Sequence, residues 1–296
     1  MRVLTKSVLV VTCLLLGVAF VWAQPRPRPK ATAPAATEAN PQKAASLFDA
    51  GQEAHAAGKL EDAVKLYSQA LELDASLWQA EFQRASAYYS LQRLPDAQAS
   101  INKVLEQLKG FADSPELKQI TAKAQTLRGD IAFALQQPTE AEAAFRQALV
   151  ADANHKRAHS GLAQVLLASN KLAEAITAAK AAIAAGEDSS LIYALLGHAQ
   201  WRTGANDDAL VSLTEALKRE PNNAQALRDR ADVLLMRNDP ARAAADLQAL
   251  LAVEKSTATM MRLAALYRAA KQYDDATKLY QQVVEAEPAN QEVRTA

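Results

Sequence analysis

Two histidines have the spacing that comes nearest to a metal site. His155 and His159 lie four positions apart, which would place both imidazoles on one face of a helix. The intervening segment, Lys156-Arg157-Ala158, lacks the glutamate of the H-E-x-x-H motif and puts two cations between the candidate ligands. We therefore predict no metal site, and we interpret the pair as partly exposed histidines at the start of a helix.

Paired acidic residues are the other groups that could do chemistry. Glu61-Asp62, Asp207-Asp208 and Asp274-Asp275 each directly precede an alanine near the expected start of a helix. Negative charge at that place complements the helix dipole, so we assign these pairs a structural role. The sequence contains neither a glycine-rich phosphate loop nor a G-x-S-x-G nucleophile elbow. We predict no catalytic residues and no cofactor, and hence a protein that is not an enzyme.

The N-terminus has the pattern of an export signal. Arg2 and Lys6 precede an uncharged run from Ser7 to Ala23, and Val21-Trp22-Ala23 offers the small residues that a signal peptidase requires. We predict a signal peptide over residues 1–23, secretion across the inner membrane and a periplasmic location. An uncleaved anchor stays open as an alternative, because the 17-residue run is at the short limit of a bilayer span. Cleavage would also remove Cys13, which is the single cysteine, and with it any disulfide or cysteine nucleophile.

The segment that follows is rich in proline. Residues 24–41 contain five prolines, three basic residues and one acidic residue, so we predict a disordered, partly extended linker. After removal of residues 1–23 the chain carries 31 basic and 33 acidic residues. This slight negative balance disfavours nucleic acid as a partner. We expect contact with a membrane only through an uncleaved N-terminal segment.

Two series of small residues run through the rest of the chain with nearly the same period. The first consists of alanines separated by 34, 44, 34, 34, 34 and 33 residues. The second, twelve positions upstream in every case, consists of glycine or alanine. Such self-similarity is the signature of a repeat architecture. The first series is Ala63, Ala97, Ala141, Ala175, Ala209, Ala243 and Ala276, and the second is Gly51, Ala85, Gly129, Ala163, Gly197, Ala231 and Ala264.

A bulky residue follows most alanines of the first series by four positions, as at Tyr67, Phe145 and Leu213. Small residues on two helices let their backbones approach closely, while the bulky residue fills the space beside the contact. Each helix pair alone would leave an apolar face exposed, and stacking of neighbouring pairs buries it. An apolar content of 50% with only 5% aromatic residues fits such an alanine-rich helical stack.

These columns resemble the tetratricopeptide repeat family, and the best match runs from Leu191 to Pro221. The resemblance implies an all-α, right-handed superhelical solenoid of about seven helix-turn-helix repeats over residues 42–296. The expected units lie near 44–77, 78–111, 115–155, 156–189, 190–223, 224–256 and 257–290. The 44-residue interval inserts ten residues near Gly110, and Ser114 followed by Pro115 predicts a helix start there.

Function is then expected on the concave side of the solenoid, which the first helix of each unit would line. Aromatic residues and arginines are the types that anchor protein partners. We predict a non-catalytic scaffold or adaptor of the bacterial cell envelope that binds a peptide or helix of a partner there. An accessory subunit of an envelope enzyme, or an enzyme with an acid pair such as Asp130 and Asp232 in the groove, stays open as the alternative. The predicted partner-binding residues are Phe82, Tyr89, Lys123, Phe133, His198, Trp201, Arg202, Arg228, Asp232 and Arg268.

The export prediction can be tested directly on protein from the native cell envelope. Cleavage after Ala23 should leave Gln24 as the first residue, which mass spectrometry of the N-terminal peptide would detect. An intact segment from Met1 to Ala23 in a membrane fraction would instead establish the anchor.

Overall fold

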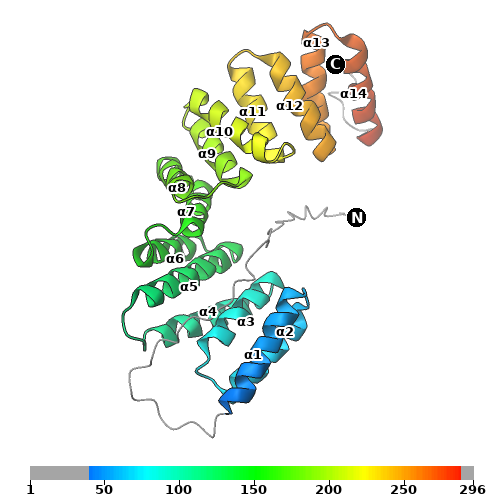
Figure 1. Ribbon diagram of the computed structural model, residues 1–296. Coiled ribbons are helices and arrows are strands. Elements are labelled where there is room, and N and C mark those ends of the chain that lie inside the picture. The colour runs from blue at the N-terminus through cyan, green and yellow to red at the C-terminus, as the bar shows by residue number, and fades with distance from the viewer. Residues whose placement is uncertain (1–39, 288–296) are drawn as a thin grey trace.

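The computed structural model describes residues 40–287, and this part of the chain is an all-α solenoid of seven antiparallel helix pairs (Figure 1). The predicted signal peptide, nearly all of the predicted linker and the end of the seventh unit lie outside the described residues. The helices are α1 (Pro41–Ala56), α2 (Leu60–Leu73), α3 (Trp78–Ser90), α4 (Leu94–Leu108), α5 (Pro115–Ala134), α6 (Pro138–Ala151), α7 (Lys156–Ala168), α8 (Leu172–Ala184), α9 (Ser190–Arg202), α10 (Asn206–Arg219), α11 (Ala224–Met236), α12 (Pro240–Val253), α13 (Thr257–Ala269) and α14 (Tyr273–Ala286). None of them is long and apolar enough to cross a bilayer.

The two series of small residues form the contacts between helices. All fourteen residues are buried, and the alanines of the two series are at most 3% exposed. The glycines lie closest to bulky side chains: a Cβ on Gly51 would stand 2.6 Å from the Tyr67 ring, and one on Gly197 would stand 2.6 Å from Leu213 Cγ. The sequence prediction of close backbone approach at these positions is therefore confirmed.

Phe145 makes the tightest contact of this kind. Its ring, on α6, lies against Gly129 of α5 and Gly161 of α7, and a Cβ on the two glycines would come within 2.7 Å and 2.4 Å of ring atoms. The side chain is 1% exposed. One aromatic ring thus joins its own helix pair to the next pair along the solenoid.

The turns inside the units use left-handed backbone. Gly58 and Gly204 have φ of +74° and +81°, a conformation that glycine adopts without steric cost. The other five units place glutamine, asparagine or lysine there, with φ between 58° and 61°. Pro95, Pro138 and Pro240 occupy the first turn of α4, α6 and α12, where proline removes no helical hydrogen bond.

The ten-residue insertion mainly lengthens α5. This helix has 20 residues, whereas α3, α7, α9, α11 and α13 have 13 each. Its start is the predicted one: Ser114 Oγ accepts a hydrogen bond from the Leu117 N–H at 3.1 Å, and Pro115 is the first helical residue. The acidic pairs also lie where the dipole argument placed them, in the first turns of α2, α10 and α14.

The histidine pair belongs to the start of α7. His155 is the N-cap, and its Nδ1 accepts a hydrogen bond from the Ala158 N–H at 3.3 Å. His159 Nε2 lies 2.9 Å from the carbonyl oxygen of Ala153. Asn223, two repeat periods later, caps α11 in the same way through its Oδ1. Both histidine side chains therefore contact backbone atoms at the start of α7.

The contact around Phe145 can be tested by a double-mutant cycle. Gly161→Ala should lower the free energy of unfolding by up to about 2 kcal/mol, because overpacking costs about 1 to 3 kcal/mol and helix propensity returns about 1 kcal/mol. In a Phe145→Leu background the ring atoms that the new Cβ meets are gone. The same Gly161→Ala change should then stabilise the protein, and chemical denaturation would measure both values. Equal effects in the two backgrounds would contradict the assigned contact.

The cap at His155 predicts a pH dependence. Burial lowers the pKa of His155 below its ordinary value of 6.5, with Asp152 opposing and Lys123 adding to the shift. The unfolded chain then binds the proton more readily than the folded chain, so the free energy of unfolding should fall as the pH drops below about 6.5. His155→Asn copies the cap of Asn223 without a titrating group, and should make the decline between pH 7 and pH 5 shallower. Denaturation curves of both proteins that keep parallel pH profiles would refute this role.

Candidate partner-binding face

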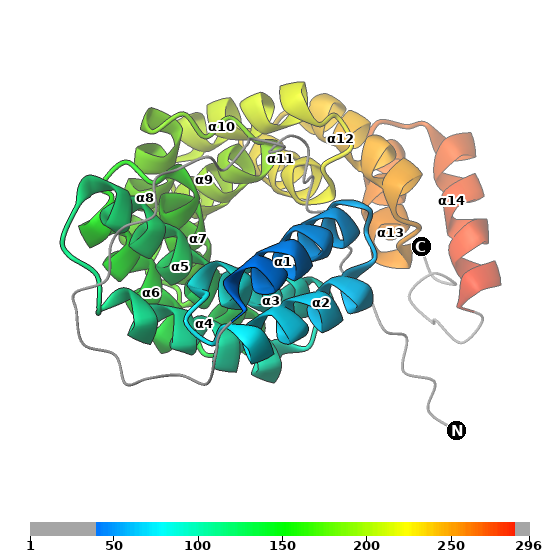
Figure 2. The same cartoon turned by 60° about the horizontal axis from the view of Figure 1, so that its bottom comes forward.

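The odd-numbered helices lie on the inner side of the curved solenoid (Figure 2). Backbone contacts between consecutive units connect α1 with α3, α3 with α5, α5 with α7, α7 with α9 and α9 with α11. Even-numbered helices of consecutive units make no comparable contacts within residues 40–287. A stack whose first helices are closer together than its second helices must curve toward the first helices. We call the inward surface of the odd-numbered helices the concave face.

All ten predicted partner-binding residues are on odd-numbered helices. Phe82 and Tyr89 are on α3, Lys123 and Phe133 are on α5, and His198, Trp201 and Arg202 are on α9; Arg228 and Asp232 are on α11, and Arg268 is on α13. Their helices span most of the solenoid, so the residues form a strip and not one compact cluster (Figure 1).

The aromatic members of this strip also support the interior. Phe82 and Tyr89 pack against the core around α3, α4 and α5, Phe133 packs against the next core cluster, and Trp201 packs against the cluster of α10 to α12. All four are half-buried. Each ring thus has one edge in the core and one accessible part, as is usual for aromatic residues that anchor a partner.

His198 and Trp201 are brought together on α9. Their rings meet edge to face with centroids 5.6 Å apart. His198 Nδ1 lies 2.8 Å from Oδ2 of Asp229 on α11, and the Gln225 amide donates to Asp229 Oδ1 at 2.8 Å. Asp229 is only 2% exposed, so it acts as a buried support that holds the imidazole in place. Sequence reasoning did not identify Asp229.

Ion pairs connect other positions of the concave face to one another. Arg157 of α7 binds Asp130 of α5 at 2.8 Å, and Arg262 of α13 binds Asp232 of α11. Burial raises the pKa of Asp130, and the charge and hydrogen bond of Arg157 partly oppose that effect. These pairs tie consecutive odd-numbered helices together across the unit boundary.

Two predicted arginines also have partners. Arg228 forms an ion pair with Glu254 and donates to Gln225 Oε1 at 3.2 Å. Arg202 donates to Oδ1 of Asn170, in the turn that follows α7, at 2.8 Å. The structure shows that much of this charge is already compensated within the protein.

The structure does not bring together the two carboxylates that the alternative of an enzyme with an acid pair would need. Asp130 and Asp232 lie on α5 and α11, with α7 and α9 between them, and each is bound to a different arginine. Within residues 40–287, no group of three or more histidine, cysteine or acidic residues could hold a metal ion.

Comparison with known proteins agrees with this architecture. The tetratricopeptide repeat family model matches residues 48–110, 126–190 and 195–258, and a second model of the same description matches residues 258–290. A search of curated proteins gave no match.

Three solved structures illustrate the likeness in fold. PilF of Pseudomonas aeruginosa is 16% identical, with a TM-score of 0.61 over 75% of this chain and 96% of that one. PilW, a type IV pilus biogenesis factor, is 18% identical, with a TM-score of 0.60 over 74% and 97%. YrrB, a TPR protein with an unusual peptide-binding site, is 21% identical, with a TM-score of 0.51 over 64% and 92%. Since the family model covers more than half of the sequence and the helix pairs repeat with its period, this chain belongs to the tetratricopeptide repeat family.

Proposed function

We propose that this protein is a non-catalytic scaffold or adaptor that binds a peptide or helix of a partner protein on its concave face. The observation that carries the proposal is the cluster of Trp201, His198 and Asp229, in which a half-buried indole lies beside an imidazole held by a buried carboxylate. Such a cluster loses little conformational freedom when a partner covers it, so that little entropy opposes binding. Tetratricopeptide repeat proteins commonly act as protein-interaction scaffolds.

The paired charges suggest how the energy of binding is divided. A partner that contacts Arg228 must compete with Glu254, and one that contacts Arg202 must compete with Asn170. Exchange of one ion pair for another gives little net energy, whereas burial of an aromatic surface gives more. We therefore assign affinity mainly to the aromatic residues and assign register and orientation to the charged ones.

We also propose that the protein works in the bacterial cell envelope, in the periplasm. The export pattern of the first 23 residues supports this location, and PilW, a type IV pilus biogenesis factor, has a similar fold. The partner would then be another envelope protein. Chemical crosslinking in the native envelope followed by purification of this chain should recover it.

Binding of the recovered partner tests whether the aromatic residues contribute more to affinity than the charged residues do. Trp201→Ala should weaken binding by about 2 kcal/mol or more, the loss typical of an aromatic anchor. Arg228→Ala should cost less than about 1 kcal/mol, and its effect should shrink as salt is added. Isothermal titration calorimetry at two salt concentrations would measure both.

A matched control separates binding from folding. Val211 is 65% exposed on α10, one of the outer helices, so Val211→Ala should leave the affinity unchanged. Circular dichroism must show that the Trp201→Ala protein keeps its helical content, because the indole also packs against the core. A folded Trp201→Ala protein that binds as tightly as the parent would refute the role of the concave face.

A further inference from the structure

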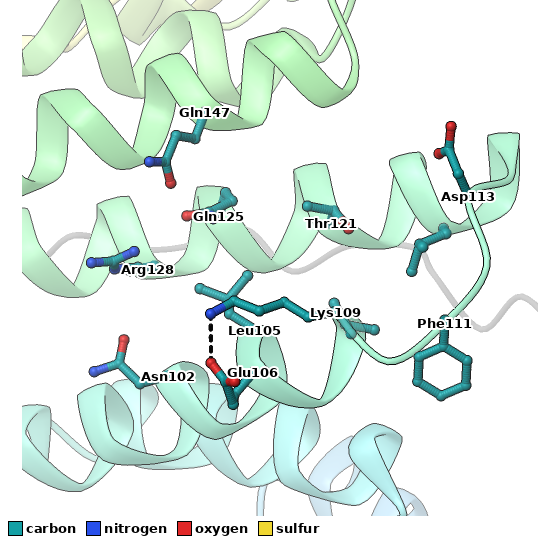
Figure 3. A pocket seen from close by; sticks show the side chains of 12 residues that line it. Asn102, Leu105, Glu106, Lys109, Phe111, Asp113, Thr121, Gln125, Arg128 and Gln147 are labelled. Carbon is teal, nitrogen blue, oxygen red and sulfur yellow. Dashed lines mark hydrogen bonds and ion pairs between the residues drawn. The ribbon is translucent and has the colours of Figure 1, made fainter. Parts of the chain in front are cut away.

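A cleft on a different surface is formed where the insertion lengthens α5. It has a volume of about 630 Å³, within the range of ligand-binding sites, and it lies between α4 and α5 (Figure 3). Gln125 and Arg128 line it from α5, Asn102 lines it from α4, and Gln147 projects from α6 toward Gln125. Apolar side chains, those of Leu105, Phe111 and Leu117, extend it toward the inserted loop.

This cleft is separate from the concave face. Gln125 and Arg128 follow Lys123 by two and five positions, and a helix turns by about 100° per residue. They therefore lie on the side of α5 opposite to Lys123 and Asp130. A ligand of the cleft and a partner on the concave face would contact opposite sides of the same helix.

Arg128 is unusual among the arginines of the described chain. Every other arginine between residues 40 and 287 has an ion pair, a hydrogen bond or another electrostatic contact with the protein. In the same part of the chain Arg128 has none, although it is partly buried. The acidic residues of the cleft are already occupied, because Glu106 binds Lys109 at 2.6 Å and Asp113 binds Lys118 at 3.4 Å.

The repeats themselves show what an arginine at this position normally binds. Arg84, Arg128 and Arg230 each directly precede a small residue of the second series, so they occupy the same repeat position. Arg84 binds Glu81 at 2.7 Å and Ser68 Oγ at 3.1 Å. Arg230 binds both carboxylate oxygens of Asp246, at 2.7 and 2.8 Å. In each of these two units a carboxylate of the same chain neutralises the arginine.

Both carboxylates are missing from the unit that contains Arg128. Gln125 stands at the repeat position of Glu81, four before the small residue, and Ala144 stands at the position of Asp246, three after the alanine of the first series. Asn102 replaces the hydroxyl residue Ser68 on the preceding even-numbered helix. In addition, the Gln125 Oε1 atom is buried without a hydrogen-bond donor. The unit thus keeps the cation and lacks the anion.

We propose that the cleft between α4 and α5 binds an acidic segment of a partner protein, with a carboxylate of that segment paired to Arg128. A carboxylate there would complete the arrangement that Glu81 and Asp246 provide in the other units. The exposed side-chain amide of Asn102 can hydrogen-bond to the backbone of the same segment, and an apolar neighbour of the acidic residue fits against Leu105 and Leu117. The apolar wall favours a peptide over a small inorganic anion, because apolar side chains can pack against a peptide side chain but cannot form hydrogen bonds with an anion.

The test titrates the purified full chain with a blocked pentapeptide in which a glutamate lies between two leucines. NMR signals of the protein backbone and of the arginine side chains report binding. The peptide should shift the Arg128 Nε–Hε signal in a saturable way. The matched peptide with glutamine in place of glutamate should bind at least about tenfold more weakly, the loss expected when a charge-assisted hydrogen bond is removed.

Two variants act on the cleft in different ways. Arg128→Gln removes the cation, and Gln125→Glu supplies the internal carboxylate that Arg84 has in Glu81. Each should weaken glutamate-peptide binding at least about tenfold. Arg242→Gln is the control, because Arg242 is an exposed arginine of α12 far along the solenoid, bound to Asp239, and it should bind like the parent. Circular dichroism should show all three proteins folded.

Several outcomes would overturn the proposal. These are the absence of saturable shifts at Arg128, equal binding of the two peptides, or undiminished binding to the Gln125→Glu protein. Displacement of the peptide by an equal concentration of inorganic phosphate would reassign the cleft to a small anion. A dimer in sedimentation that dissociates in the Arg128→Gln protein would reassign it to a second copy of this chain. Trp201 lies on the concave face and Arg128 lies in the cleft, so the binding tests of the two proposals have independent outcomes.

Discussion

The structure depends on close packing of a small residue on one helix against a bulky side chain on another. Gly129 and Gly161 accept the Phe145 ring from two sides, and Gly51 and Gly197 accept Tyr67 and Leu213 in the same manner. A solenoid has no central core, so each unit must gain its stability from contacts with its own second helix and with the neighbouring unit. A ring that touches two successive odd-numbered helices serves both contacts at once. This explains why the small positions keep their period when most other positions vary.

The curvature that follows from this packing determines what the concave face can do. The odd-numbered helices are close enough for side chains of consecutive units to meet, as Asp130 and Arg157, His198 and Asp229, and Asp232 and Arg262 do. These pairs hold the inner surface in one geometry. They also neutralise charge that a partner could otherwise bind, so the partner recognition proposed for this face would rely on the half-buried aromatic residues between them.

The period of the small residues predicted the fold in some detail. It gave about seven helix pairs, while the helix dipole accounted for the first-turn acidic residues and the cap at Ser114 and Pro115 for the start of α5, and all of these are present. The charge pairs across units were not predicted. In the three pairs named above the partners are 27 to 31 residues apart, which is one repeat minus one or two helical turns, and this spacing acquires meaning only when the stacking of units is known. Asp229 was missed for that reason, and the partner-binding role of the ten selected residues stays a prediction.

Repetition also gives this protein an internal standard of comparison. When the same repeat position carries the same residue in three units, the surroundings in two units show what that residue needs. Arg84 and Arg230 form ion pairs with Glu81 and Asp246, so a carboxylate of the same chain neutralises each of them. Arg128 has an amide and an alanine in the equivalent places, inside the 44-residue interval between Ala97 and Ala141. A partly buried guanidinium without a counter-charge costs folding free energy, and it costs less where solvent or a ligand can reach it. Arg128 lines a cleft whose other end is walled by the inserted loop at Phe111 and Asp113, so the insertion and the unpaired arginine border the same cleft.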